Sequence, residues 1–329
     1  MPDDKAPAFQ LVDRFRRDRP KEPQRTGIPF LADKSPTEHY VMDEHLEHAA
    51  NTALALGQPL LLTGDPGTGK TQFAHHLAWQ LGLGDPLEFH TKSSSAASDL
   101  FYSHDTVRRF HAAHMGQENV AEHDFVKFNA LGEAILLSLC EADRVGMYGI
   151  HLADAPAEPM RSVVLIDEID KAPRDFPNDL LHEIPNMAFR IPELNLHVKG
   201  DPQYRPVVII TSNRERPVPD AFLRRCIFHN IESPTKERMA QILCARFGYV
   251  GKGTPPFIDS VAELLITLRT KLLRPPSTAE TVAWVHLLIG SGVNMAATIQ
   301  QQGDKALKFL SVLAKTREDV ATMRTLLTA

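Results

Sequence analysis

The chain has 329 residues, 43% of them hydrophobic and 23% charged, and its formal net charge is −5. The length predicts about two domains with a sizeable core, and the composition excludes a wholly disordered chain. The acidic balance excludes a strongly basic nucleic-acid binder, and no apolar run is long enough to span a bilayer. Three widely spaced cysteines argue against a disulfide framework, and the start MPDDKAPAF lacks the features of a secretory signal, so we expect a cytoplasmic protein.

The first 30 residues are polar and rich in proline and arginine, which predicts an N-terminal extension over residues 1–30. After it, helical patterns alternate with short apolar runs that predict buried strands. Helices are expected over 42–56 and 71–81, and the strand runs are PLLLTG, LEFHT, SVVLIDE and PVVIITSN. This βαβα alternation predicts an α/β fold, with a parallel sheet covered by helices in a three-layer αβα core.

After about residue 233 only helical patterns follow, which predicts a core over 31–233 and a small all-α domain over 234–329. Two stretches of the core are longer than plain connections between elements. Residues 92–160 separate the second and third strands, and the turn-rich residues 191–205 predict a β-hairpin.

A glycine-rich sequence follows the first strand and matches the phosphate-binding pattern GxxxxGK[ST] at every fixed position. Its glycines let successive N–H groups turn toward a polyphosphate, and the helix after it directs the positive end of its dipole at the same anion. We expect the lysine to reach the β- and γ-phosphates and the last threonine to coordinate Mg²⁺. The expected binding residues are Gly64, Asp65, Pro66, Gly67, Thr68, Gly69, Lys70 and Thr71.

Acidic and amide side chains end two later strands, where ligands of a parallel sheet bind. Asp167 and Glu168 close the run VVLIDE, and Asn213 closes VVIITSN. We expect Asp167 to hold Mg²⁺ through a water and Glu168 to polarise the water that attacks the γ-phosphate. Asn213 either orients that water or simply begins a turn.

Two arginines, Arg224 and Arg225, follow the short helical stretch PDAFL. They come too late in the chain to reach the phosphate of the same molecule easily. One of them is therefore a candidate to neutralise the γ-phosphate of a neighbouring molecule, and the alternative is a solvated basic helix end.

Other features favour simpler interpretations. His111 and His114 have the helical spacing of a metal pair, but no cysteine or carboxylate completes a ligand set at recognisable spacing. The triplet Arg108-Arg109-Phe110 is more typical of a solvated helix face than of a partner site. No guanine-reading [NT]KxD string follows the third strand, which favours ATP over GTP.

The strings GDPGTGKT, VVLIDEID, IITSN and AFLRRC, in this order, resemble the AAA+ ATPase superfamily over roughly residues 35–290. The string IDEIDKAPRDFPNDLLHEIPN is similar to the MoxR-type branch, which carries a helix-2 insert and a hairpin before sensor 1. The stretches 92–160 and 191–205 fall where those insertions lie. By this resemblance, Asn213 is the polar residue called sensor 1, at the end of its strand. Arg225 is the first choice, and Arg224 the second, for the arginine finger that reaches the nucleotide of a neighbouring subunit in trans.

The chain departs from the branch at sensor 2. The branch carries an arginine in a Pro-Ser-x-Arg string on its lid, and Ala279 stands at that position here. Either Arg274 reaches in from upstream, or the lid supplies no cation to the γ-phosphate. Tyr40 and Val41 precede the first helix, where the family packs the adenine.

The resemblance implies a Mg²⁺-dependent ATPase that forms a ring, a hexamer in the family, and remodels or activates a protein client as a chaperone does. It also implies a von Willebrand A-type partner, and 92–160 is the stretch where a client site is expected. The alternative is an ATP-gated scaffold or signalling switch, for example in bacterial defence. The net charge and the lack of a dedicated nucleic-acid domain argue against a nucleic-acid-stimulated motor.

Overall fold

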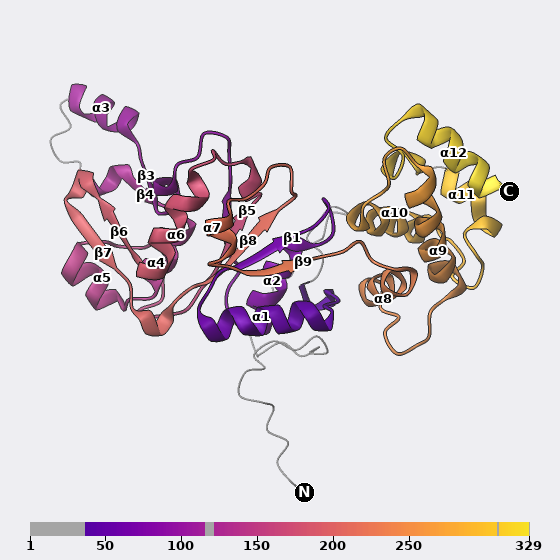
Figure 1. Ribbon diagram of the computed structural model, residues 1–329, viewed down its shortest axis with the longest axis horizontal. Helices are drawn as coiled ribbons and strands as arrows, with labels where there is room; N and C mark the ends of the chain where they lie inside the picture. The colour runs from indigo at the N-terminus through magenta and orange to yellow at the C-terminus, as the bar shows by residue number, and fades with distance from the viewer. Residues whose placement is uncertain (1–36, 116–121, 308, 329) are drawn as a thin grey trace, which may run out of the picture. The chain divides into compact units, whose positions relative to one another are not determined.

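Figure 1 shows the computed structural model, which describes residues 37–115, 122–307 and 309–328. The extension predicted for residues 1–30 lies outside these residues. The described chain divides into two units, each with its own hydrophobic core. The first unit holds Glu44–Thr63 and Leu77–His229, and the second holds 37–43, Gly64–His76 and the chain from Asn230. The glycine-rich loop is thus grouped with the C-terminal helices.

The first unit is built on a five-stranded sheet in the order β2-β5-β8-β1-β9. The pairs β2–β5, β5–β8 and β1–β8 are parallel, which confirms the predicted parallel sheet. The strands are β1 (Leu60–Thr63), β2 (Leu87–His90), β5 (Val163–Asp167), β8 (Val207–Ser212) and β9 (Ile227–Asn230). The apolar residues of β1, β5 and β8 are buried, because helices cover a parallel sheet on both faces.

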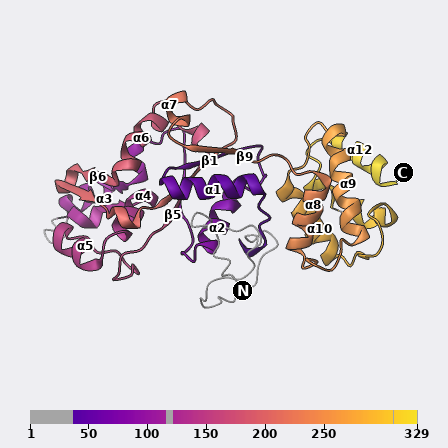
Figure 2. The ribbon, with the colours of Figure 1, turned by 60° about the horizontal axis from the view of Figure 1, so that its bottom comes forward.

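Helix α1 (Glu44–Leu56) lies beside β1 (Figures 1 and 2), and α2 (Lys70–Gln80) follows the loop after that strand. Strand β9 was not predicted, because its sequence, IFHN, is short and only half apolar. It joins the sheet beside β1, where the Ile227 N–H donates to the Pro59 carbonyl at 2.8 Å.

The long stretch between β2 and β5 carries its own elements. It holds η2 (Ala97–Leu100), an antiparallel pair β3 (Tyr102–His104) and β4 (Val126–Phe128), α3 (Thr106–His114), η3 (Glu122–Phe125), α4 (Ala130–Leu137) and α5 (Glu141–Tyr148). Helix α4 packs against β2 and β5, and all its residues except Glu133 are buried. The stretch predicted as an insertion therefore includes a helix of the core.

A hairpin is present near the predicted place, but it starts earlier than 191–205. It pairs β6 (Ala188–Ile191) with β7 (Leu196–Lys199) and lies beside α4 and α5 (Figures 1 and 2). Helix α6 (Phe176–Asn186) precedes it and ends at Met187, which has a left-handed φ of 47°. The apolar residues of β6 continue the helical pattern of α6 without a break. The start of the hairpin could therefore not be predicted from the sequence.

From Asn230 on, the described residues of the second unit hold five α-helices, packed around Trp284 and Phe257. They are α8 (Lys236–Arg246), α9 (Pro256–Lys271), α10 (Thr278–Gly290), α11 (Gly303–Leu307) and α12 (Arg317–Thr328). The last of them begins at a cap, where the Thr316 hydroxyl accepts the Asp319 N–H at 3.0 Å. Within the described chain, no helix has both the length and the apolar character needed to cross a membrane.

Candidate functional site

The glycine-rich loop curves around the amine of Lys70. The Lys70 Nζ donates to the carbonyl oxygens of Gly64 at 2.8 Å and Asp65 at 2.9 Å, and the side chain is buried. Gly67 has a φ of 76°, a left-handed conformation that favours glycine. A Cβ on Gly64 would lie 2.3 Å from the Ile231 carbonyl oxygen, so this position also requires glycine.

The predicted binding residues of the loop differ in exposure. Asp65, Pro66 and Gly67 form an exposed tip, while Thr68, Gly69 and Thr71 are half-buried. The Thr68 hydroxyl donates to the Asp65 carbonyl at 2.9 Å, and this hydrogen bond stabilises the turn. Thr71 stands in the first turn of α2, where the N–H groups and the positive end of the helix dipole favour an anion.

The start of α10 contacts the same loop. The Ala279 N–H donates to the Gly67 carbonyl at 3.4 Å, and the Ser277 Cβ lies 2.5 Å from the place where a Cβ on Gly67 would stand. Ala279, the residue at the position of the sensor 2 arginine, thus contacts the loop through its backbone. Arg274 is exposed, and its guanidinium makes no hydrogen bond or ion pair with other residues of the described chain.

Tyr40, predicted with Val41 to lie near the adenine, packs against the first turns of α2. The Tyr40 ring packs on Phe73 and His76, at centroid distances of 5.8 and 5.3 Å, and lies 3.2 Å from the place of a Cβ on Gly69. Burial raises the pKa of Tyr40 above its usual value, and the Asp43 carboxylate raises it further. The Val41 carbonyl accepts a hydrogen bond from Arg238 at 2.9 Å.

In the first unit, a buried hydroxyl joins the two acidic residues at the end of β5. Thr211 on β8 donates to Asp167 Oδ1 at 2.6 Å and accepts the Glu168 N–H at 2.8 Å. Its side chain is 1% exposed. The sequence interpretation missed Thr211, and the signal for it was a polar residue two positions before Asn213, directly after four apolar residues of the strand.

Both carboxylate oxygens of Glu168 have partners. Asn213 Nδ2 donates to Oε1 at 3.0 Å, and the Lys171 ammonium pairs with Oε2. The hydrogen bond to Glu168 raises the pKa of Lys171. Glu168 also has a left-handed backbone, with a φ of 56°, which is a strained conformation for a residue with a side chain. The predicted pair Glu168 and Asn213 is therefore in direct contact, and Lys171 is a third member that was not predicted.

The buried Asp170 carboxylate positions the loop after β8. Its oxygens accept the N–H of Asn213 at 3.2 Å and the N–H of Glu215 at 2.9 Å. On the other side of β5, His90 at the end of β2 lies 3.6 Å from Asp167 Oδ2. Neither Asp170 nor His90 was predicted, because their roles depend on contacts between strands.

Arg224 and Arg225 follow α7 (Asp220–Leu223) and are exposed. In the part of the chain that the structure describes, neither guanidinium makes a hydrogen bond or an ion pair. By contrast, the two arginines of the triplet Arg108-Arg109-Phe110, predicted to be a solvated helix face, both contact other side chains. Arg109 Nη2 pairs with Glu122 at 2.7 Å, and Arg108 lies over the Phe125 ring at 5.9 Å.

Residues 59–226 match the model of the AAA domain family, dynein-related subfamily. No curated protein sequence matches the chain significantly. The solved Thermotoga maritima RuvB Holliday junction branch migration motor is similar to the chain, with 18% identity, a TM-score of 0.44 and coverage of 88% of this chain and 75% of that one. A variant of the same protein gives 16% identity, a TM-score of 0.47 and the same coverage.

Proposed function

The chain belongs to the dynein-related AAA domain family, and from this premise we propose that it is a Mg²⁺-dependent ATPase that remodels or activates a protein client. The observation that carries the proposal is the contact of Glu168 with Asn213 at the end of the strand pair β5–β8. A carboxylate held by a neighbouring amide at this edge of a parallel sheet suits the positioning of an attacking water.

The glycine-rich loop fits a polyphosphate. Its positive-φ glycines, the buried Lys70 amine and the start of α2 combine a turn of N–H groups, a cation and a helix dipole. ATP supplies the phosphoanhydride bond when bound. Lys70 would then exchange its bonds to the loop carbonyls for bonds to phosphate oxygens.

The oxygen ligands suit Mg²⁺, which prefers hard donors and keeps several waters. Thr71 would offer its hydroxyl and Asp167 its carboxylate, which Thr211 holds through Oδ1. When bound, the ion would supply positive charge that offsets the negative charge of the phosphate oxygens. To orient the attacking water, Glu168 would give up its bond to Lys171 or Asn213 and accept a hydrogen bond from the water instead.

The proposed assembly is a homo-oligomeric ring, with a hexamer as the expected form. Arg225, or Arg224 as the second choice, would reach the γ-phosphate of a neighbouring subunit, and the exposure of both guanidinium groups supports this role. In the second unit, the contact of α10 with Gly67 offers a path by which nucleotide binding moves the helices. We propose that this movement acts on the client, with a von Willebrand A-type protein as a candidate partner.

The decisive test is the variant Glu168→Gln. It keeps the shape of the side chain and removes the charge, so ATP binding should stay near that of the wild type while hydrolysis falls by about 100-fold or more. Fluorescent-nucleotide binding and phosphate release measure the two quantities separately. Lys70→Ala is the matched control, because it should lose binding as well. Wild-type turnover in Glu168→Gln would contradict the role of Glu168.

A further inference from the structure

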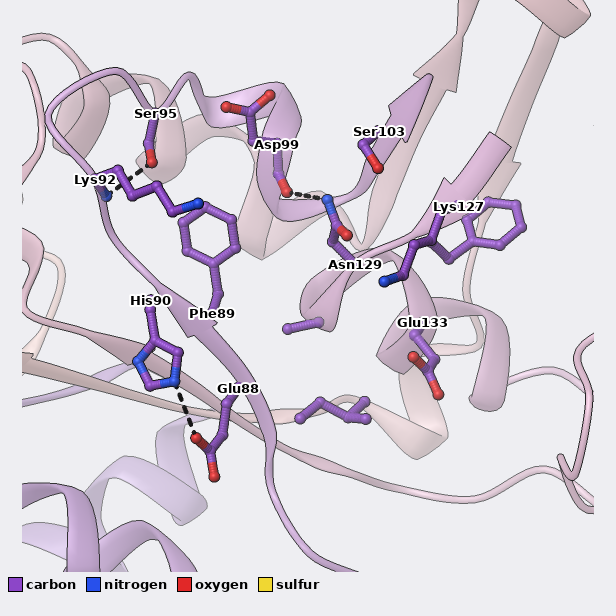
Figure 3. A pocket seen from close by; sticks show the side chains of 13 residues that line it. Glu88, Phe89, His90, Lys92, Ser95, Asp99, Ser103, Lys127, Asn129 and Glu133 are labelled. Carbon is purple, nitrogen blue, oxygen red and sulfur yellow. Dashed lines mark hydrogen bonds and ion pairs between the residues drawn. The ribbon is translucent and has the colours of Figure 1, made fainter. Parts of the chain in front are cut away.

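A cavity of about 530 Å³ lies beside β2, the edge strand of the sheet (Figure 3). Its walls come from the whole of β2, the loop and 3-10 turn after it, the β3–β4 pair and the first turn of α4. All of these elements belong to the first unit. The volume lies within the range of ligand pockets, roughly 300–1,000 Å³.

Two ammonium groups enter this cavity from opposite walls. Lys92 extends from the loop after β2 and Lys127 from β4, and their amines point toward the space between them (Figure 3). Neither ammonium makes a hydrogen bond or an ion pair with another residue of the described ranges. Two like charges that face one space repel, and an anion placed between them removes that repulsion.

Two carboxylates of the cavity wall are engaged elsewhere. The Asp99 carboxylate accepts the Ala96 N–H at 2.9 Å, and Glu88 Oε2 pairs with His90 Nε2 at 3.3 Å. The third, Glu133, is half-buried. Burial raises its pKa, and the charge of Lys127 lowers it in part. The two ammonium groups are therefore the places in the cavity wall at which an added carboxylate would bind.

The rest of the cavity suits an extended polypeptide. Phe89 and Phe128 add apolar surface to its wall. The Thr91 N–H donates to the Asp167 carbonyl at 3.1 Å, so the residue before it, His90, turns its backbone to the side of β2 away from β5. An edge strand of this kind pairs readily with an added strand.

We propose that this cavity binds an extended acidic segment of a protein client. The carboxylates of the segment lie between Lys92 and Lys127, and its main chain pairs along β2. The proposal rests on the proposed role in client remodelling, but the binding step itself needs no nucleotide. Since the chain has a net charge of −5, an acidic peptide gains nothing from the overall charge, and its binding must be local.

The test uses the full chain without nucleotide and three fluorescein-labelled octapeptides, (Val-Glu)4, (Val-Lys)4 and (Pro-Glu)4. Fluorescence anisotropy should show binding of (Val-Glu)4 and none of (Val-Lys)4. It should show at least tenfold weaker binding of (Pro-Glu)4, in which every second residue lacks its N–H and has a fixed φ. The double variant Lys92→Gln, Lys127→Gln should weaken the binding of (Val-Glu)4 by about tenfold or more. Both side chains are exposed, so we expect the variant to fold, as circular dichroism can verify.

Lys199→Gln is the matched control, because it removes one exposed ammonium of the same unit outside the cavity. It should leave the affinity for (Val-Glu)4 unchanged. Equal affinity in the wild type and the double variant, or an equal loss in Lys199→Gln, would overturn the site. If (Pro-Glu)4 bound as tightly as (Val-Glu)4, or if inorganic phosphate at the same concentration displaced (Val-Glu)4, the cavity would bind only anions. Either result would overturn the assignment to a peptide. ATP hydrolysis, measured separately, reports on the proposed function alone.

Discussion

Thr211 shows how one buried hydroxyl can hold a charged site together. It donates to Asp167 and accepts from the Glu168 backbone, so it fixes both acidic residues to the neighbouring strand. Thr211→Val keeps the shape and removes both bonds. We expect a loss of about 1–3 kcal/mol in the free energy of unfolding, because Asp167 Oδ1 and the Glu168 N–H both lose this partner.

The same variant should lower hydrolysis about tenfold, equivalent to roughly 1.4 kcal/mol in the activation free energy. Urea unfolding and steady-state phosphate release measure the two effects. Thr211→Ser is the matched control, since it keeps the hydroxyl and should recover most of the activity. If Thr211→Val and Thr211→Ser behaved alike, the hydroxyl would have no role in the site.

At this scale the sequence predicted the residues of fixed motifs and missed their supports. Asp167, Glu168 and Asn213 follow apolar strands, and their places at the strand ends follow from that pattern alone. Thr211, Lys171 and Asp170 act through contacts that depend on strand order and on the turn after β5. No spacing in one sequence predicts that β5 and β8 are neighbours.

Among the elements, α4 depends on one glycine. A Cβ on Gly132 would lie 1.9 Å from the carbonyl oxygen of Phe101, so any side chain there would push α4 away from the turn before β3. Gly132→Ala should therefore destabilise the protein by about 1–3 kcal/mol, the usual cost of overpacking a core. Thermal unfolding followed by circular dichroism measures the change.

Gly146→Ala is the matched control for that prediction. Gly146 lies in α5 with nothing within 4 Å of an added Cβ, so the substitution should stabilise its helix by roughly 0.5–1 kcal/mol. A neutral or stabilising effect of Gly132→Ala would show that α4 can move from Phe101 without cost. Opposite signs for the two variants are the expected result.

The elements were predicted best where the apolar pattern was strong and unbroken. The strands β1, β5 and β8 lie close to the predicted places, and helices follow residue 233 as predicted, because the burial of their apolar residues alone determines them. Strand β9 and the β6–β7 hairpin were missed or shifted, since they depend on pairing with a neighbour. The cavity beside β2 could not be predicted, because its lysines are brought together only by the β3–β4 pair.

For the whole molecule, the exposure of Arg225 leads to a prediction about assembly. Arg225→Ala should keep ATP binding and lose hydrolysis if, as we propose, the residue completes the site of a neighbouring subunit. Lys70→Ala should lose nucleotide binding and keep its own Arg225. Neither variant should hydrolyse ATP when it is alone.

An equal mixture of Arg225→Ala and Lys70→Ala should recover activity at interfaces where the first binds ATP and the second supplies the arginine. With random assembly of heterologous interfaces, about one quarter of the sites have this pairing. A mixture of Glu168→Gln with Lys70→Ala is the control, since both defects lie in the site of one subunit and no pairing repairs them. Absence of recovery in the first mixture would remove Arg225 as a residue acting in trans, and Arg224→Ala would then be tested in the same way. Recovery in the first mixture alone would require an oligomer in which neighbouring subunits share each site.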